Sequence, residues 1–119
     1  ALAMIGLPLF IGHMDTMCFY EDVQYLKHWP GIPFGDEEGE IISGVLKDKW
    51  SALLGHHGMI VGGTTIEEAT YRAYFFEKAA EMQLEALQAV GGDVERLQKV
   101  DPELARKARD WRISDGPTK

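Results

Sequence analysis

Two adjacent histidines, His56 and His57, lie between two short apolar segments, and their setting is the strongest indication of chemistry in this sequence. Residues 50–54 and 59–61 are mostly apolar, which predicts two short strands joined by a turn at Gly58. A histidine at a strand end can offer a neutral imidazole to a metal ion, or it can be an ordinary structural residue, and the residues alone leave both interpretations open. Because neighbouring side chains of an extended segment point to opposite faces, we expect one imidazole to face a site and the other to face away.

Two further groups carry chemically useful side chains upstream of this turn. His13 and Asp15 are spaced to share one face of an extended segment, where they can complete a metal shell, orient a ligand, or act as acid and base. A local turn held by an Asx-type hydrogen bond is the alternative. Tyr20, which is close to Tyr25, can donate a proton to a carbonyl or enolate oxygen. The alternative is that these tyrosines lie at the amphipathic edge of a core.

The clearest predicted element is a helix that begins after Gly63. Thr64 with Glu67, and Thr65 with Glu68, both have the spacing of a capping box. The glycines and threonines at this start can also bind an anion, but the lysine of a P-loop is missing, so capping is favoured. The apolar stripe expected to face the core comprises Ile66, Ala69, Ala73, Phe76, Ala80, Leu84 and Leu87.

The other expected elements are shorter. They are the last turn of a helix at 1–5, a strand at 9–11, a loop at 28–33, a helix after Asp36 with its stripe on Ile41, Ile42, Val45 and Leu46, and polar helices at 95–100 and 102–112. The apolar residues between 17 and 26 fit neither the helical repeat of about 3.6 residues nor the strand repeat of about 2 residues. Strands that alternate with helices indicate an α/β layered sheet of about four strands.

Composition limits the classes of function. The 119 residues make at most one modest domain, and 45% hydrophobic content is typical of a globular protein. A net charge of −7 disfavours a nucleic-acid or anionic-membrane partner. A single cysteine, Cys18, suits a reducing compartment, so we expect a cytoplasmic protein, and no apolar run is long enough to span a membrane. The sequence begins in an apolar segment without an initiator, which leads us to expect a fragment of a longer chain.

Residues 53–69, with the sequence LLGHHGMIVGGTTIEEA, resemble the C-terminal half of the class II aldolase/adducin family, in which a strand, an Asn/His-His-Gly turn, a second strand and a helix follow one another. Residues 76–84 are similar to the same helix, and residues 12–20 are similar to an aldolase-like or decarboxylase-like subgroup. The resemblance implies that residues 1–119 form part of a three-layer α/β/α domain around a central, mainly antiparallel sheet.

The resemblance also implies a catalytic metal ion. Family enzymes hold a divalent metal, most often zinc but sometimes manganese or iron, with three histidines. Two come from a His-x-His motif, which we expect a few residues before Ala1, and His57 matches the third while His56 occupies a non-ligand position. The full-length parent is therefore expected to be a metal-dependent lyase that cleaves a C–C bond of a small oxygenated substrate through a metal-stabilised enolate. The fragment alone is expected to be inactive.

Family members form tetramers with the active site between subunits, and a tyrosine can be lent by the neighbouring subunit. Tyr20 is the candidate for that role, and His13 is the second candidate catalytic residue. One alternative is a decarboxylase that uses the same metal-stabilised enolate and releases carbon dioxide. The others are a non-catalytic adducin-like scaffold that has lost the metal histidines and a sugar-phosphate epimerase. The presence of His57 favours an enzyme over the scaffold, and this segment shows no phosphate pocket for an epimerase.

Overall fold

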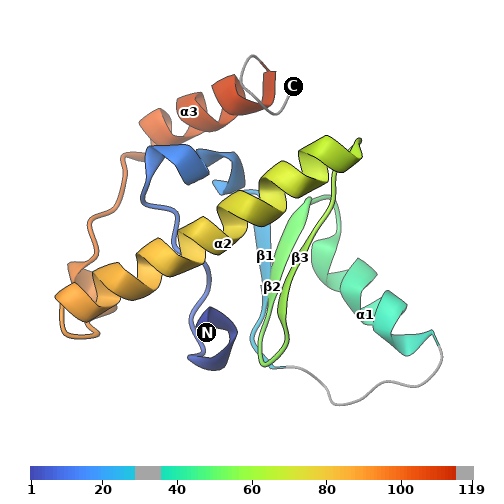
Figure 1. Ribbon diagram of the computed structural model, residues 1–119, viewed down its shortest axis with the longest axis horizontal. Helices are drawn as coiled ribbons and strands as arrows, with labels where there is room; N and C mark the ends of the chain where they lie inside the picture. The colour runs from blue at the N-terminus through green and yellow to red at the C-terminus, as the bar shows by residue number, and fades with distance from the viewer. Residues whose placement is uncertain (29–35, 115–119) are drawn as a thin grey trace.

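The computed structural model of this chain describes residues 1–28 and 36–114. In order, the elements are the 3₁₀ turns η1 (Leu2–Met4) and η2 (Met14–Phe19), strand β1 (Val23–Leu26), helix α1 (Glu37–Leu46), strands β2 (Ser51–Leu54) and β3 (Gly58–Val61), helix α2 (Ile66–Ala89), the 3₁₀ turn η3 (Val94–Arg96) and helix α3 (Pro102–Ser114). Figure 1 shows α2 crossing the sheet as the longest helix. The predicted α/β class is confirmed.

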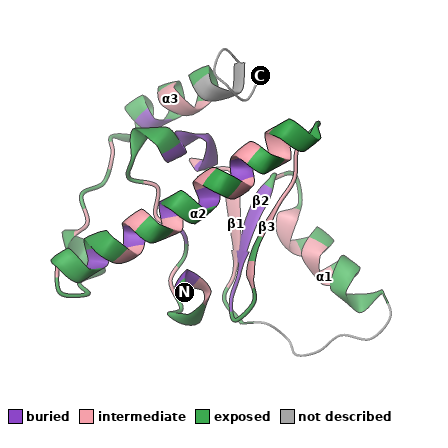
Figure 2. Ribbon diagram, viewed as in Figure 1, coloured by how far each residue is buried: buried purple, intermediate pink, exposed green. Residues whose placement is uncertain are grey.

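The three strands form one sheet in the order β1-β2-β3. Strand β2 is central and runs parallel to β1, with Leu26 opposite Leu54, and antiparallel to β3, with Leu54 opposite Gly58. Each residue of β2 is buried, whereas β1 and β3 are half-buried apart from the exposed Met59 (Figure 2). Strand β2 consists of Ser51 and three apolar residues and is covered on both faces, which explains why the 51–54 segment does not alternate.

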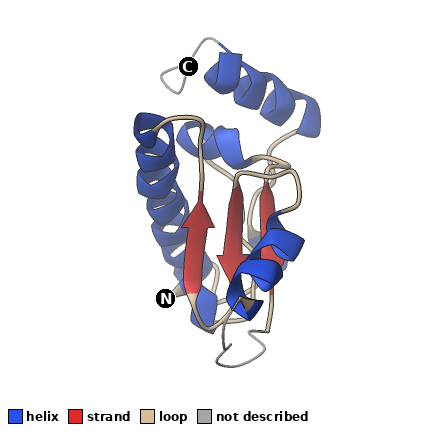
Figure 3. Cartoon of the chain, turned by 90° about the vertical axis from the view of Figure 1, so that its right-hand side faces the viewer, coloured by secondary structure: helices blue, strands red, loops and turns tan. Residues whose placement is uncertain are grey.

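Helices cover both faces of the sheet. Leu53 packs in the main core cluster with Phe76 and Ala79 of α2, and Phe19 of η2 meets Phe76 edge to face at 5.5 Å between ring centres. Ala52 and Leu54 point to the opposite face because side chains alternate along a strand. Helix α1 lies in front of that face (Figure 3). The chain therefore has the helix–sheet–helix layering that the family resemblance implies.

The start of α2 confirms the cap predicted at Thr65. Its hydroxyl accepts a hydrogen bond from the Glu68 amide at 3.1 Å, and the Thr64 hydroxyl donates to the Glu68 carboxylate at 2.7 Å. That second bond is the main reason why the pKa of Glu68 is lowered. The helix ends before Gly91 and Gly92, whose φ angles of +68° and +81° suit glycine.

The buried face of α2 is more polar than the predicted stripe. Ile66 is 83% exposed, while Arg72 and Gln83 are buried. Arg72 donates to the Gly62 carbonyl at 2.8 Å, pairs with Glu68 and lies 5.1 Å from the Trp50 ring. These two long side chains hold neighbouring backbone in place, so they belong to the core for structural reasons.

Two predicted elements are wrong. The segment 9–11 is not a strand, because the side chain of Gln83 accepts from the Phe10 amide at 2.8 Å and donates to the Pro8 carbonyl at 3.0 Å, replacing a strand partner. The helix expected at 95–100 is only the short turn η3, which contains no buried residue to stabilise it.

Some expectations fall partly or wholly outside the described residues. Of the predicted loop 28–33 only His28 is described, and residues 115–119 are not described. Within the described ranges, no helix is both long and apolar enough to cross a membrane.

Candidate functional site

The turn after β2 holds both adjacent histidines at the end of the central strand. Three backbone hydrogen bonds fix it: the Gly55 amide donates to the Leu26 carbonyl at 2.6 Å, the His56 amide to the Ala3 carbonyl at 2.8 Å, and the His57 amide to the Leu54 carbonyl at 3.0 Å. His56 adopts a left-handed φ of +63°. The turn is therefore a rigid platform, held by β1 on one side and the N-terminal segment on the other.

His57 presents a half-exposed imidazole towards α1. Its Nε2 atom lies 3.9 Å from the Glu38 carboxylate, and the two side chains are 50% and 48% exposed. A pair this open to water contributes little to stability. The ring is not buried in apolar packing, so the geometry is compatible with a role as a metal ligand.

His56 points elsewhere, but strand alternation is not the reason, because the residue lies in the turn with a left-handed φ of +63°. Its ring lies 6.4 Å from that of His28, centre to centre, with 26° between the planes. His28 follows β1, and the sequence placed it only in a loop. No sequence signal identified this pair, because the contact depends on the parallel pairing of two strands far apart along the chain.

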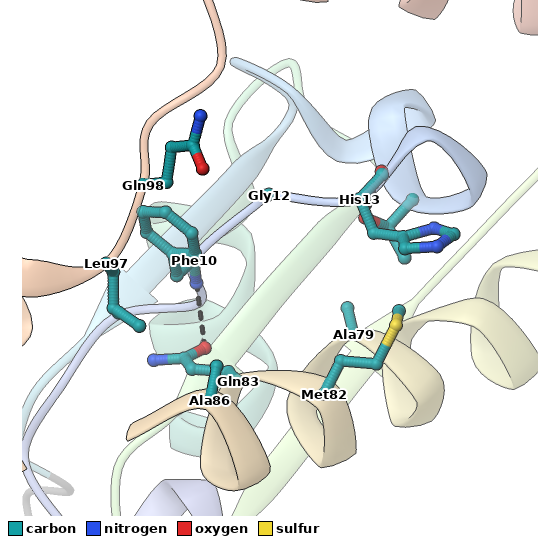
Figure 4. A pocket seen from close by; sticks show the side chains of 10 residues that line it. Phe10, Gly12, His13, Ala79, Met82, Gln83, Ala86, Leu97 and Gln98 are labelled. Carbon is teal, nitrogen blue, oxygen red and sulfur yellow. Dashed lines mark hydrogen bonds between the residues drawn. The ribbon is translucent and has the colours of Figure 1, made fainter. Parts of the chain in front are cut away.

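His13 lies in a different part of the molecule. It caps η2, with Nδ1 accepting from the Asp15 amide at 3.1 Å. A local turn was one alternative from the sequence, but the imidazole holds it here in place of the expected Asx-type hydrogen bond. Because that nitrogen accepts, the neutral ring carries its proton on Nε2. The side chain lines a cavity of about 280 Å³ together with Met82 and Gln83 of α2 (Figure 4).

Tyr20 follows η2 and precedes β1. Its carbonyl oxygen accepts from Arg109 of α3 at 3.1 Å, and the next residue, Glu21, accepts from Arg106 at 2.8 Å. This hydrogen bond from Arg106 is the main cause that lowers the pKa of Glu21. Since β1 and β2 are parallel, Tyr20 before β1 and His57 after β2 lie at opposite ends of the sheet, about 10 Å apart or more at roughly 3.3 Å per residue.

The described part of the chain does not by itself make a metal site. Among residues 1–28 and 36–114, no three His, Cys, Asp or Glu side chains are grouped so that they could hold a metal ion. A catalytic zinc ion usually takes three protein ligands. Within the described residues His57 could therefore supply at most one of these ligands, and neither His13 nor Tyr20 lies beside it within a single chain.

Comparison with known proteins identifies the class. The family model of the class II aldolase and adducin N-terminal domain matches residues 1–84. The chain belongs to this family, as the turn and the following helix indicated.

Particular relatives support the same fold. The solved structure of an L-fuculose 1-phosphate aldolase from Glaciozyma antarctica PI12 superposes with a TM-score of 0.71 and 26% identity, over 92% of this chain and 38% of that one. An aldolase II superfamily protein from Pseudomonas syringae gives a TM-score of 0.78 at 24% identity, over 98% and 45% of the two chains, which shows the fold alone. The meiotically up-regulated gene 14 protein of Schizosaccharomyces pombe is 29% identical over 84 residues, which are 71% of this chain and 33% of that protein. The chain thus spans between a third and a half of these relatives.

Proposed function

We propose that this chain is the part of a metal-dependent lyase of the aldolase type that supplies one histidine ligand, His57, to a divalent ion. The observation that carries the proposal is the half-exposed imidazole of His57 on a rigid turn, in a chain that belongs to the class II aldolase and adducin family. Similarity to an L-fuculose 1-phosphate aldolase supports C–C bond cleavage of a small oxygenated substrate.

A bound divalent ion would polarise the carbonyl oxygen of the substrate and so favour cleavage of the neighbouring C–C bond. The chain's own contribution is to hold the His57 ring in place through the backbone bonds of the turn. Glu38 lies against the same Nε2 atom, so coordination through that nitrogen would displace the weak contact with the carboxylate. Zinc is the first candidate, because it readily accepts imidazole, and manganese or iron are the alternatives.

His13 and Tyr20 enter the proposal only through assembly. Both lie away from His57 in one chain, so either can act on the substrate only from a neighbouring subunit, as a homotetramer with shared active sites would allow. Within this proposal, the neutral His13 ring donates from Nε2 and the Tyr20 phenol donates to an oxygen of the substrate. A cytoplasmic location agrees with the presence of a single cysteine, the buried Cys18.

The test uses the full-length protein with L-fuculose 1-phosphate as the first probe. We expect release of an aldehyde that is abolished by a chelator, restored by zinc, and absent from a His57→Ala variant. Carbon dioxide release from a β-keto acid, without aldehyde release from any phosphorylated sugar tested, would overturn the aldolase proposal in favour of a decarboxylase. Absence of bound metal together with absence of both activities would overturn it in favour of a scaffold.

A further inference from the structure

The pair His28 and His56 is the group of metal-ligating side chains that the proposed function does not use. Both side chains are exposed, and their ring centres are 6.4 Å apart. Within residues 1–28 and 36–114 no carboxylate pairs with either ring. Two exposed imidazole rings therefore lie near each other and are available to a ligand.

The fold fixes the distance between the two histidines. Leu26 and Leu54 are register partners on parallel strands, and each histidine comes two residues after its leucine. Gly55 brings the backbones unusually close, because its amide meets the Leu26 carbonyl and a Cβ atom there would clash with the Lys27 carbonyl. The two backbone segments are therefore held before any ligand arrives, which limits the ordering needed on binding.

The spacing is close to that of a shared ion. With about 2.0–2.1 Å from metal to nitrogen and about 1.2 Å from nitrogen to ring centre, two imidazoles on one tetrahedral ion have ring centres about 5 Å apart. The observed rings are stacked with 26° between their planes and centres 6.4 Å apart, so binding requires the two centres to approach by about 1 Å and the rings to turn. Because both side chains are exposed, their rings can rotate to turn nitrogens towards one ion without disturbing the core.

We propose that His28 and His56 form a second cation site, which binds one divalent transition-metal ion through two imidazole nitrogens and fills the remaining positions with water. Imidazole selects ions such as Zn²⁺, Ni²⁺ and Cu²⁺, whereas Mg²⁺ and Ca²⁺ require oxygen ligands. The site does not include His57, whose ring faces Glu38 instead. The inference therefore holds whether or not the proposed lyase activity is correct.

The experiment is a Ni²⁺ titration by calorimetry of the full-length protein, first saturated with its resident metal. His28→Gln and His56→Asn remove one ring each, and asparagine tolerates the left-handed backbone at position 56. His13→Gln is the matched control, since it removes another exposed histidine from a distant part of the fold. Circular dichroism checks that each variant is folded.

We expect one additional Ni²⁺ per chain in the wild type and in His13→Gln, and no binding of Mg²⁺ at the same concentration. Each of the other two variants is expected to lose at least about 10-fold in affinity, because loss of even an outer-shell partner commonly costs 10–100-fold. Wild-type affinity in His28→Gln, or no Ni²⁺ beyond the resident ion in the wild type, would overturn the proposal. If Ni²⁺ binding is lost only in a His57→Ala variant, the ion belongs to the other site and the proposal is also wrong.

Discussion

Gly55 is the residue on which the position of both histidine groups depends, and replacing it by alanine tests that dependence. A Cβ atom at position 55 would clash with the Lys27 carbonyl oxygen and lie 2.9 Å from the Leu26 carbonyl oxygen. Both atoms belong to the backbone, so no side-chain rotation can relieve the overlap. The ends of β1 and β2 would have to separate, and the turn that carries His57 would move with them.

The size of the effect follows from two contributions. Forcing an extra methyl group into a packed site costs about 1–3 kcal/mol. Separation of the strand ends also weakens the 2.6 Å hydrogen bond from the Gly55 amide to the Leu26 carbonyl, which is worth about 1 kcal/mol. Together they destabilise the protein by about 2–4 kcal/mol, a large part of the roughly 5–15 kcal/mol by which native proteins are stable.

Thermal unfolding followed by circular dichroism measures this effect, and Gly44→Ala is the matched control. A Cβ atom at Gly44 meets nothing within 4 Å, and the residue lies inside α1. Alanine at this position should therefore stabilise the folded protein by about 0.5–1 kcal/mol. We expect Gly55→Ala to lower Tm by about 5 °C or more and Gly44→Ala to leave it unchanged or higher. A Gly55→Ala protein as stable as the wild type would refute the close strand approach.

Three further substitutions test the packing of α2. Thr65→Ala removes the hydroxyl that accepts from the Glu68 amide, so it should lower the free energy of unfolding, measured in urea, by about 1 kcal/mol. An unchanged free energy of unfolding would mean that the cap does not form in solution. Phe76→Ala, at a side chain only 2% exposed, should cost about 3–5 kcal/mol, and a cost below about 1 kcal/mol would contradict its place in the core. The folded pKa of Glu68 is lowered, so its stabilisation is complete above its unfolded pKa of about 4.3 and is lost as pH falls through the lower folded value. As the pH falls from about 5 to about 3, the free energy of unfolding of the wild type should therefore decrease more than that of Glu68→Gln. An equal decrease in the two proteins would disprove this.

Local signals predicted the elements that depend on local chemistry. The helix from Ile66, its threonine cap and its end at Gly91 were all readable, because caps and glycine stops act within a few residues. Burial on that helix was less predictable. Gln83 is buried because it binds backbone far away in sequence, at Phe10. Arg72 is buried against the Gly62 carbonyl just before the helix, and Ile66 is exposed at the first turn.

The candidate site was predictable only in part, for the same reason. The turn at His57 follows from an apolar strand, a glycine and a second strand, which lie together in the sequence. The approach of His28 to His56 depends on strand pairing across more than twenty residues, and the segment 17–26 gave no clear period from which to place β1. Whether His13 and Tyr20 act with His57 depends on assembly, which a single chain does not encode locally.

The metal content of the full-length protein tests the central claim most directly. After chelation, reloading with zinc and extensive dialysis, elemental analysis should find about one tightly held ion per chain in the wild type and in His56→Asn, because dialysis removes an ion held by only two imidazoles, whereas His57→Ala should retain almost none. His56→Asn is the matched control because it alters the neighbouring ring and leaves His57 in place. Equal metal content in the wild type and the His57→Ala variant, with both proteins folded, would contradict the assignment of this imidazole as a ligand.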